Sequence, residues 1–331
     1  MDMIKDIRYT ELRFTVEMLE DSILPRFKSS AIRGGIGNML LDEYCIRENY
    51  RKQNEECNNC DFVDECIVQR ILYAKMDIEP KFMSAGNSIG YIVECDDTRE
   101  LFESGDELRF KLILFGKNIF YLSQYLSAVY RLGQAGLGKE KTKYDVVSVC
   151  NVFNKPILQD NNIYKDRYVI LTVDDYVEYR KKKLVENFDE LDDINTIRIK
   201  MITPISIKKQ GEYLKSFDVK DFMDNLYRRI YMMNCFEGIE KELSRLELDD
   251  YYPKLLQEES RYVEIPRYSG RKNQKIYLKG LYGSMTIDLS SVREKTGANI
   301  NKMLEDLFIG ELLHVGSNTS FGFGKYVIEL L

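Results

Sequence analysis

The chain has 331 residues, 44% of them hydrophobic, which is enough for the cores of two domains. Its net charge of −6 excludes a protein that coats nucleic acid over its whole surface, but not one with a local basic patch. No apolar run reaches the roughly 18 residues of a membrane span, and the first residues lack an apolar signal core. We therefore expect a cytoplasmic protein with no membrane partner.

The first half of the chain predicts strands and helices in the order β-α-β-β-α-β. Alternation of apolar residues indicates strands, and apolar residues on one helical face indicate the helices. This order is typical of a ferredoxin-like domain. The predicted elements are a strand at 8–18, a helix that begins at Ser29 and Ser30, strands at 91–94 and 107–115, a helix at 118–132, and a last strand after a glycine loop.

The second half repeats this architecture after a polar, highly charged linker at 181–193. In both halves a helix leads into glycines, a lysine and an apolar strand, which indicates an internal repeat of structure rather than of sequence. The cationic run at 180–183 is followed by acidic residues and is interpreted as a solvated face. The predicted elements are a strand at 196–208, a helix at 220–239, a strand at 277–288, a helix at 301–316, and a final strand at 326–330.

Four of the seven cysteines cluster in a polar context between the first helix and the next strand. Their spacing, C-x11-C-x2-C-x5-C, can place four thiolates around one tetrahedral Zn²⁺. Four protein ligands would close the site, so the predicted zinc is structural. An iron–sulfur cluster and a loop of free thiols are the alternatives. The predicted ligands are Cys45, Cys57, Cys60 and Cys66.

The end of the chain, HVGSNTSFGFGKYVIEL, contains the only histidine, His314, then a glycine-rich loop at 316–325 and an apolar strand. Glycines let a backbone approach a partner closely and adopt positive φ at little cost. A lysine in the same loop adds a charge suited to phosphate. We therefore predict that the loop binds phosphates, through the residues Gly316, Gly322, Gly324 and Lys325.

Several segments together resemble the RAMP superfamily of CRISPR-associated proteins, and within it the endoribonucleases that process CRISPR repeat RNA. The most specific is the glycine-rich loop in HVGSNTSFGFGKY. The others are the helix start LPRFKSSAIRGGIG, the cysteine cluster, the strand TPISIKKQG and the segment RYSGRKNQKIYLKGLYGSM. The resemblance implies an α+β protein of two tandem ferredoxin-like (RRM-like) domains, at 1–190 with the cysteine cluster at 45–66, and at 195–331.

Metal-independent RNA cleavage needs a group that accepts the proton of the ribose 2′-hydroxyl and a cation near the phosphate. His314 suits proton transfer, because histidine titrates near neutral pH. Its alternative is a structural role that fixes the geometry of the glycine loop. Many relatives carry a catalytic histidine in the first domain, where this chain has none. The first-domain candidates are Lys28, Tyr44 and, as a phosphate ligand, Arg33.

The segment 267–279 is basic and contains no acidic residue, although the whole chain is acidic. Tyrosines lie among its cations, a combination that suits an RNA backbone with stacked bases. The alternative is a solvated charged hairpin. The residues predicted to bind RNA here are Arg267, Arg271, Lys272 and Lys275.

The resulting hypothesis is a CRISPR repeat-specific endoribonuclease. The resemblance implies that it cuts precursor CRISPR RNA without a catalytic metal and leaves a 2′,3′-cyclic phosphate, or the product of its hydrolysis, and a 5′-hydroxyl. The alternative is a non-catalytic RAMP subunit that binds guide RNA together with other subunits of a CRISPR effector complex.

Overall fold

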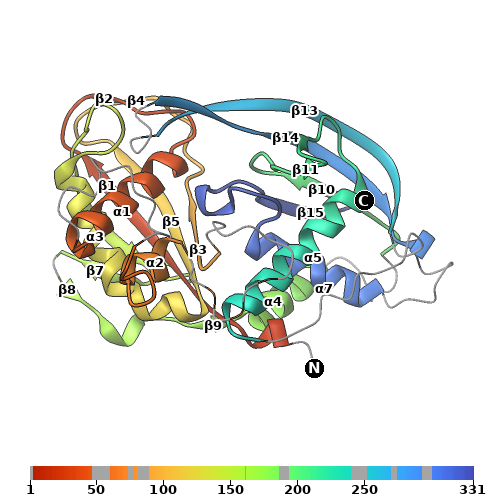
Figure 1. The fold of residues 1–331 in the computed structure, drawn as a ribbon. Helices are drawn as coiled ribbons and strands as arrows, with labels where there is room; N and C mark the ends of the chain where they lie inside the picture. The colour runs from red at the N-terminus through yellow and green to blue at the C-terminus, as the bar shows by residue number, and fades with distance from the viewer. Residues whose placement is uncertain are drawn as a thin grey trace.

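The computed structural model describes residues 3–46, 60–73, 76, 78, 80, 89–160, 162–185, 194–239, 252–269, 274–292 and 300–331. Two antiparallel sheets, each covered by helices, stand side by side (Figure 1). Among the described residues, no helix combines the length and the apolarity needed to cross a membrane.

The first domain has the strand order of a ferredoxin-like fold. Strand β1 lies between β5 and β6, and β3 extends the sheet beyond β5. Helices α1 and α3 pack together on one face, where a hydrophobic core includes Leu12, Phe14 and Leu132. The elements are β1 (Arg8–Met18), α1 (Ser29–Tyr44), α2 (Ile67–Leu72), β3 (Tyr91–Glu94), β5 (Glu107–Phe115), η3 (Gly116–Tyr121), α3 (Leu122–Ala135) and β6 (Tyr144–Cys150).

The second domain repeats this topology. Its sheet has the order β13-β14-β10-β15, so the first strand again lies between the third and the fourth. Asp218 caps α5 by accepting a hydrogen bond from the N–H group of Asp221, the expected start of a helix. The elements are β10 (Thr196–Met201), α5 (Val219–Phe236), β13 (Lys254–Ser269), β14 (Gln274–Asp288), α7 (Ile300–Leu313), η7 (Thr319–Phe321) and β15 (Tyr326–Leu330).

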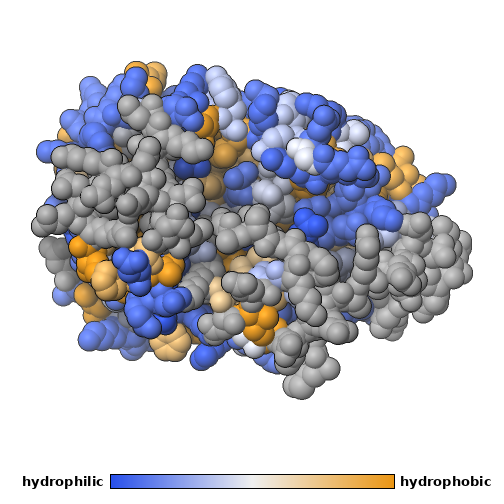
Figure 2. Space-filling model, viewed as in Figure 1, coloured by the Kyte–Doolittle hydropathy of each residue, from blue (hydrophilic) through white to orange (hydrophobic). Residues whose placement is uncertain are grey.

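The hairpin of β13 and β14 is long enough to reach from the second domain to the first. Its paired strands arch over the molecule toward α1, and α1 and β13 are in contact (Figure 1). The surface over this hairpin is largely hydrophilic (Figure 2). Strands β13 and β14 therefore form a polar surface that joins the two domains.

The two domains also share a hydrophobic core. Ile92 and Ile113, from the first sheet, are buried together with Met201 and Phe236 of the second domain. Helix α4 (Val173–Val185) follows the first sheet in sequence but packs on α7. The domains thus meet through a buried apolar interface.

Short elements complete the described structure and were not expected from the sequence. Most extend the edge of the first sheet or form two-stranded ribbons. They are η1 (Met3–Asp6), β2 (Ser22–Ile23), β4 (Leu101–Phe102), β7 (Pro156–Gln159), β8 (Asn162–Ile163), η4 (Lys165–Arg167), β9 (Leu171–Thr172), β11 (Lys208–Lys209) and β12 (Glu212–Tyr213).

The ferredoxin-like order predicted for both halves is confirmed by the sheet topology. Two local predictions are wrong. The predicted linker at 181–193 begins inside α4, which continues to Val185. Arg180, predicted to lie on a solvated face, is largely buried and forms an ion pair of 2.6 Å with Glu311, because α4 packs against α7.

Candidate functional site

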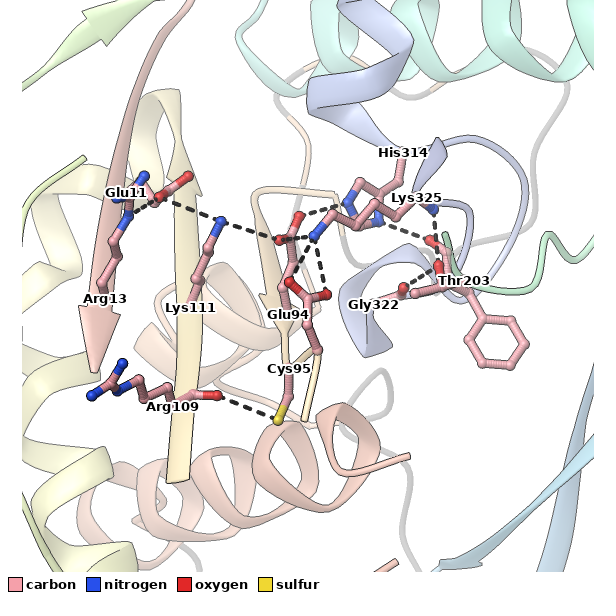
Figure 3. A network of polar contacts seen from close by, with 12 residues as sticks. Glu11, Arg13, Glu94, Cys95, Arg109, Lys111, Thr203, His314, Gly322 and Lys325 are labelled. Atoms are coloured by element: carbon pink, nitrogen blue, oxygen red, sulfur yellow. Dashed lines mark hydrogen bonds and ion pairs between the residues drawn. The ribbon is translucent and has the colours of Figure 1, made fainter. Parts of the chain in front are cut away.

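A buried polar network joins the two domains beside the glycine-rich loop (Figure 3). Glu94, at the end of β3, accepts a hydrogen bond of 2.7 Å from Lys325 Nζ through Oε2, and its Oε1 lies 2.9 Å from His314 Nε2. Lys325 also reaches Asp96, at 3.2 Å. Lys325 and His314 belong to the second domain and the two acids to the first, so these contacts hold the domains together.

His314 is fully buried, and both of its ring nitrogens face acceptors. Nδ1 lies 2.9 Å from the carbonyl oxygen of Phe323, and Nε2 faces the Glu94 carboxylate. Burial raises the pKa of Glu94, but the hydrogen bond from His314 and the charges of His314 and Lys325 bring that pKa far below its usual range. Both ring nitrogens of His314 are thus occupied by groups of the chain itself. This geometry favours the structural role of His314 over proton acceptance.

Lys325, predicted to bind phosphate, is held by Glu94 and Asp96. Burial lowers the pKa of Lys325, but these two carboxylates outweigh the burial and raise it. Its backbone N–H group donates to Thr203 Oγ1 at 3.0 Å. The charge of Lys325 therefore stabilises the contact between the domains.

The glycines of the loop allow it to dock on the first domain. Gly322 has φ +81°, and a Cβ atom there would lie 2.7 Å from the carbonyl oxygen of Val93 and 3.0 Å from Ser29 Oγ. The neighbouring Phe323 is buried, and its ring packs edge-on against Phe27 at 5.1 Å. A side chain at Gly322 would separate the loop from β3 and α1.

Most backbone N–H groups of this loop already have acceptors inside the chain. The N–H group of Gly322 donates to Thr319 and that of Gly324 to Pro204, contrary to the expectation that they face phosphates. Gly316 lies close to the backbone of Ser206, from which a Cβ atom would be only 2.7 Å away. The other loop residues whose N–H groups donate within the chain are Ser317, Phe321, Phe323 and Lys325.

Next to the loop, arginines from both domains meet on one aromatic ring. Arg33 of α1 and Arg267 of β13 place their guanidinium carbons 4.6 Å and 4.1 Å from the centre of the Phe321 ring. Arg33 also lies over Tyr91, at 5.8 Å. Burial and the nearby charge of Arg33 lower the pKa of Arg267 to about 10. The structure therefore brings together two of the residues predicted to contact RNA, from opposite ends of the chain.

The other first-domain candidates lie apart from this cluster. Lys28 is fully buried, and its Nζ donates to the carbonyl oxygens of Asp97, at 3.1 Å, and of Arg99. Tyr44 is the last residue of α1, eleven positions after Arg33. At 1.5 Å per residue this separation is about 16 Å along the helix axis, too far for both side chains to act on one phosphate.

The basic hairpin is only partly described. Lys275 and the rings of Tyr268 and Tyr277 are exposed, with Lys275 Nζ 5.4 Å from the centre of the Tyr277 ring. Lys279 forms an ion pair of 2.9 Å with Glu264 on the paired strand. The predicted RNA-binding residues Arg271 and Lys272 lie outside the described residues.

Three of the predicted zinc ligands are described. Cys45 follows α1, Cys66 precedes α2 and Cys60 lies in the turn before it; all three are half-buried free thiols. Cys57 lies outside the described residues, and among those described no group of three or more potential metal ligands is found. The zinc site remains a prediction.

Sequence reasoning missed Glu94 and Phe321. In the sequence Glu94 is an ordinary residue at the end of a strand. It contacts His314 in the fold, but the two are 220 residues apart in sequence, so no local pattern connects them. The sequence signal for Phe321 was its place directly before the first glycine of SFGFGKY, where a ring is easily attributed to the core.

The fold and these contacts define a protein of two ferredoxin-like domains joined by a glycine-rich loop. Residues 7–173 match the family model AF_1859_N, an N-terminal domain, and residues 199–326 match the model of the CRISPR-associated endoribonuclease Cas6. Residues 199–326 are therefore similar to the Cas6 endoribonuclease family, and residues 7–173 belong to the AF_1859_N family. None of the curated proteins matches it.

Solved structures support the fold. A Cas6 product complex matches with a TM-score of 0.52 at 12% identity. The match covers 97% of this chain and 99% of the Cas6 chain in that complex. A partial Cas6-RT-Cas1–Cas2 complex has a TM-score of 0.57, also at 12% identity, and 99% of this chain is covered. The chain spans 47% of that longer protein and 29% of the corresponding protein in a second such complex.

Proposed function

We propose that the protein cleaves precursor CRISPR RNA within its repeats, without a catalytic metal. The observation that carries this proposal is the hairpin of β13 and β14, which brings cations and exposed tyrosines from the second domain to α1 of the first. Phosphates of a single strand would bind the cations, and its bases would stack on the rings.

In the proposed reaction the ribose 2′-oxygen bonds to phosphorus while the bond from phosphorus to the 5′-oxygen breaks. The 2′-hydroxyl loses a proton, the 5′-oxygen gains one, and a 2′,3′-cyclic phosphate remains. Negative charge accumulates on the phosphate oxygens in the transition state. Arginines fixed beside the phosphate would stabilise this charge, an effect worth about 10²–10³ in rate for one donor.

A specific observation favours a second function. His314, the only histidine, is buried and both of its ring nitrogens contact groups of the chain itself, so the chain presents no histidine for proton transfer. A non-catalytic RAMP subunit that holds guide RNA in a CRISPR effector complex would need no such group.

One experiment separates the two functions. Purified protein is incubated with repeat RNA in EDTA, and the products are resolved at single-nucleotide resolution. A single cut within the repeat, with a cyclic phosphate on the 5′ product, supports the endoribonuclease. A gel shift without cleavage supports the binding subunit.

The contribution of the hairpin is tested separately by the salt dependence of binding. Replacement of Arg271 and Lys272 by alanine should lower the slope of log K against log salt by about 0.7 for each lost phosphate contact. A slope equal to that of the wild type would contradict RNA binding by this part of the hairpin.

A further inference from the structure

The cluster of Arg33, Phe321 and Arg267 lies where α1, the glycine-rich loop and β13 meet. Each guanidinium carbon is within 4.6 Å of one ring centre, so the two carbons are at most about 9 Å apart. One phosphate can bridge such a gap with charge-assisted hydrogen bonds of about 2.8 Å on each side. A ring that stacks a guanidinium also fixes its plane and therefore the direction of its N–H groups.

Two further features of the cluster favour an anion beside it. The described part of the chain gives the hydroxyl of Tyr91, which is fully buried beneath Arg33, no hydrogen-bond partner. Buried polar groups are normally paired, so an orphaned hydroxyl marks a place where a polar partner or water belongs. The lowered pKa of Arg267 reflects in part the repulsion from Arg33, which an anion between them would relieve.

We propose that Arg33 and Arg267 form a clamp for a single phosphodiester of the RNA, assembled across the domain interface and oriented by Phe321. The inference rests on the proposed function and deepens it, because it names the groups that bind the reacting phosphate. Arg33 and Arg267 touch that phosphate; Phe321 is a positioning residue that acts through both. The clamp exists only while the glycine-rich loop is docked on the first domain.

The test is a double-mutant cycle on single-turnover cleavage of repeat RNA in EDTA. Arg33→Ala and Arg267→Ala should each slow cleavage by about 100-fold or more. Because both act on one phosphate, the double variant should be only a few-fold slower than either single variant. Arg109→Ala, which removes an exposed guanidinium paired with Glu107 on the first sheet, is the matched control and should cleave like the wild type.

Phe321 needs a readout that a purely structural role would not change. Phe321→Leu should slow the cleavage step about tenfold with RNA affinity within threefold, and Phe321→Tyr should restore the rate. Circular dichroism and thermal melting confirm that each variant is folded. Arg33→Lys and Arg267→Lys keep the charge but lose the planar fork, so partial activity in them supports the clamp if an alanine variant does not fold.

The outcomes separate the clamp from the enzymatic proposal. Suppose that the wild type cleaves. The clamp would be overturned, and the endoribonuclease left intact, if both single arginine variants were fully active. The same holds if the rate losses of the two single variants multiplied in the double variant. If the wild type does not cleave, the same cycle is run on RNA affinity. Non-additive losses there would support the clamp in a protein that only binds RNA, and additive or absent losses would overturn it.

Discussion

Replacement of Glu94 by glutamine tests whether the buried network holds the domains together. Glutamine keeps the size of the side chain but removes the negative charge of the carboxylate that both His314 and Lys325 contact. Lys325 would stay largely buried without its principal counter-charge, and His314 would lose the carboxylate that faces its Nε2. Loss of one partner from a buried ion pair costs about 3–5 kcal/mol, so we expect the free energy of unfolding to fall by that amount.

The matched control is Asp96→Asn. Asp96 also pairs with Lys325, but its side chain is 60% exposed. Exposed ion pairs contribute about 0–1 kcal/mol, so this variant should be nearly as stable as the wild type. The free energy of unfolding is measured by urea denaturation at pH 7, followed by circular dichroism because the chain has no tryptophan.

The pH dependence gives an independent check. The pKa of Glu94 in the folded protein lies far below its ordinary value of 4.5. The ionised carboxylate therefore stabilises the fold above about pH 4.5, and this contribution is lost as the pH falls below it. The gap in stability between the wild type and Glu94→Gln should shrink from pH 7 to pH 3. A loss below 1 kcal/mol at pH 7, or a gap that does not change with pH, would refute the reasoning.

Three further predictions concern the loop, the histidine and the metal. Gly322→Ala should lower the free energy of unfolding by about 1–3 kcal/mol, because its Cβ would meet the backbone of Val93. The control is Gly34→Ala, whose Cβ would lie in open space on α1. This variant should be as stable as the wild type or more stable in the same urea assay. His314→Ala should lose stability yet cleave within tenfold of the wild type at a temperature where it is folded; a loss of about 100-fold in a variant of wild-type stability would instead show a catalytic role. Elemental analysis of protein purified without chelator should find one zinc per chain, and its retention after Cys57 and Cys60 are both changed to serine would contradict the proposed ligands.

The sequence predicted the order of the elements well, because each helix and central strand buries one face and carries the matching period. The strand at 8–18, for example, alternates along its length and is β1 in the structure. Strand β13 was not predicted. Its sequence, KLLQEESRYVEIPRYS, is mostly polar because β13 is the edge strand of its sheet and is largely exposed. Pro266 within it also weakens a strand pattern.

The candidate site was only partly predictable, because its residues are brought together by the contact between domains. Arg180 looked like part of a solvated cationic run until α4 was found to pack against α7. Arg33 and Arg267 were each expected to contact RNA, but no pattern in the sequence indicates that both would lie on Phe321. Local periodicity describes how a segment meets its own domain and carries no information about a neighbouring domain.

The glycine-rich loop explains why docking and RNA binding would be coupled in this protein. The loop could bind phosphates with its N–H groups only if they were unpaired, and most of them donate to the chain itself. Its glycines instead remove the side chains that would keep the loop away from Val93 and Ser29. Once docked, the loop places Phe321 against Arg33, while the hairpin supplies Arg267. A weaker domain interface should therefore reduce RNA cleavage even where no residue that touches RNA has been changed.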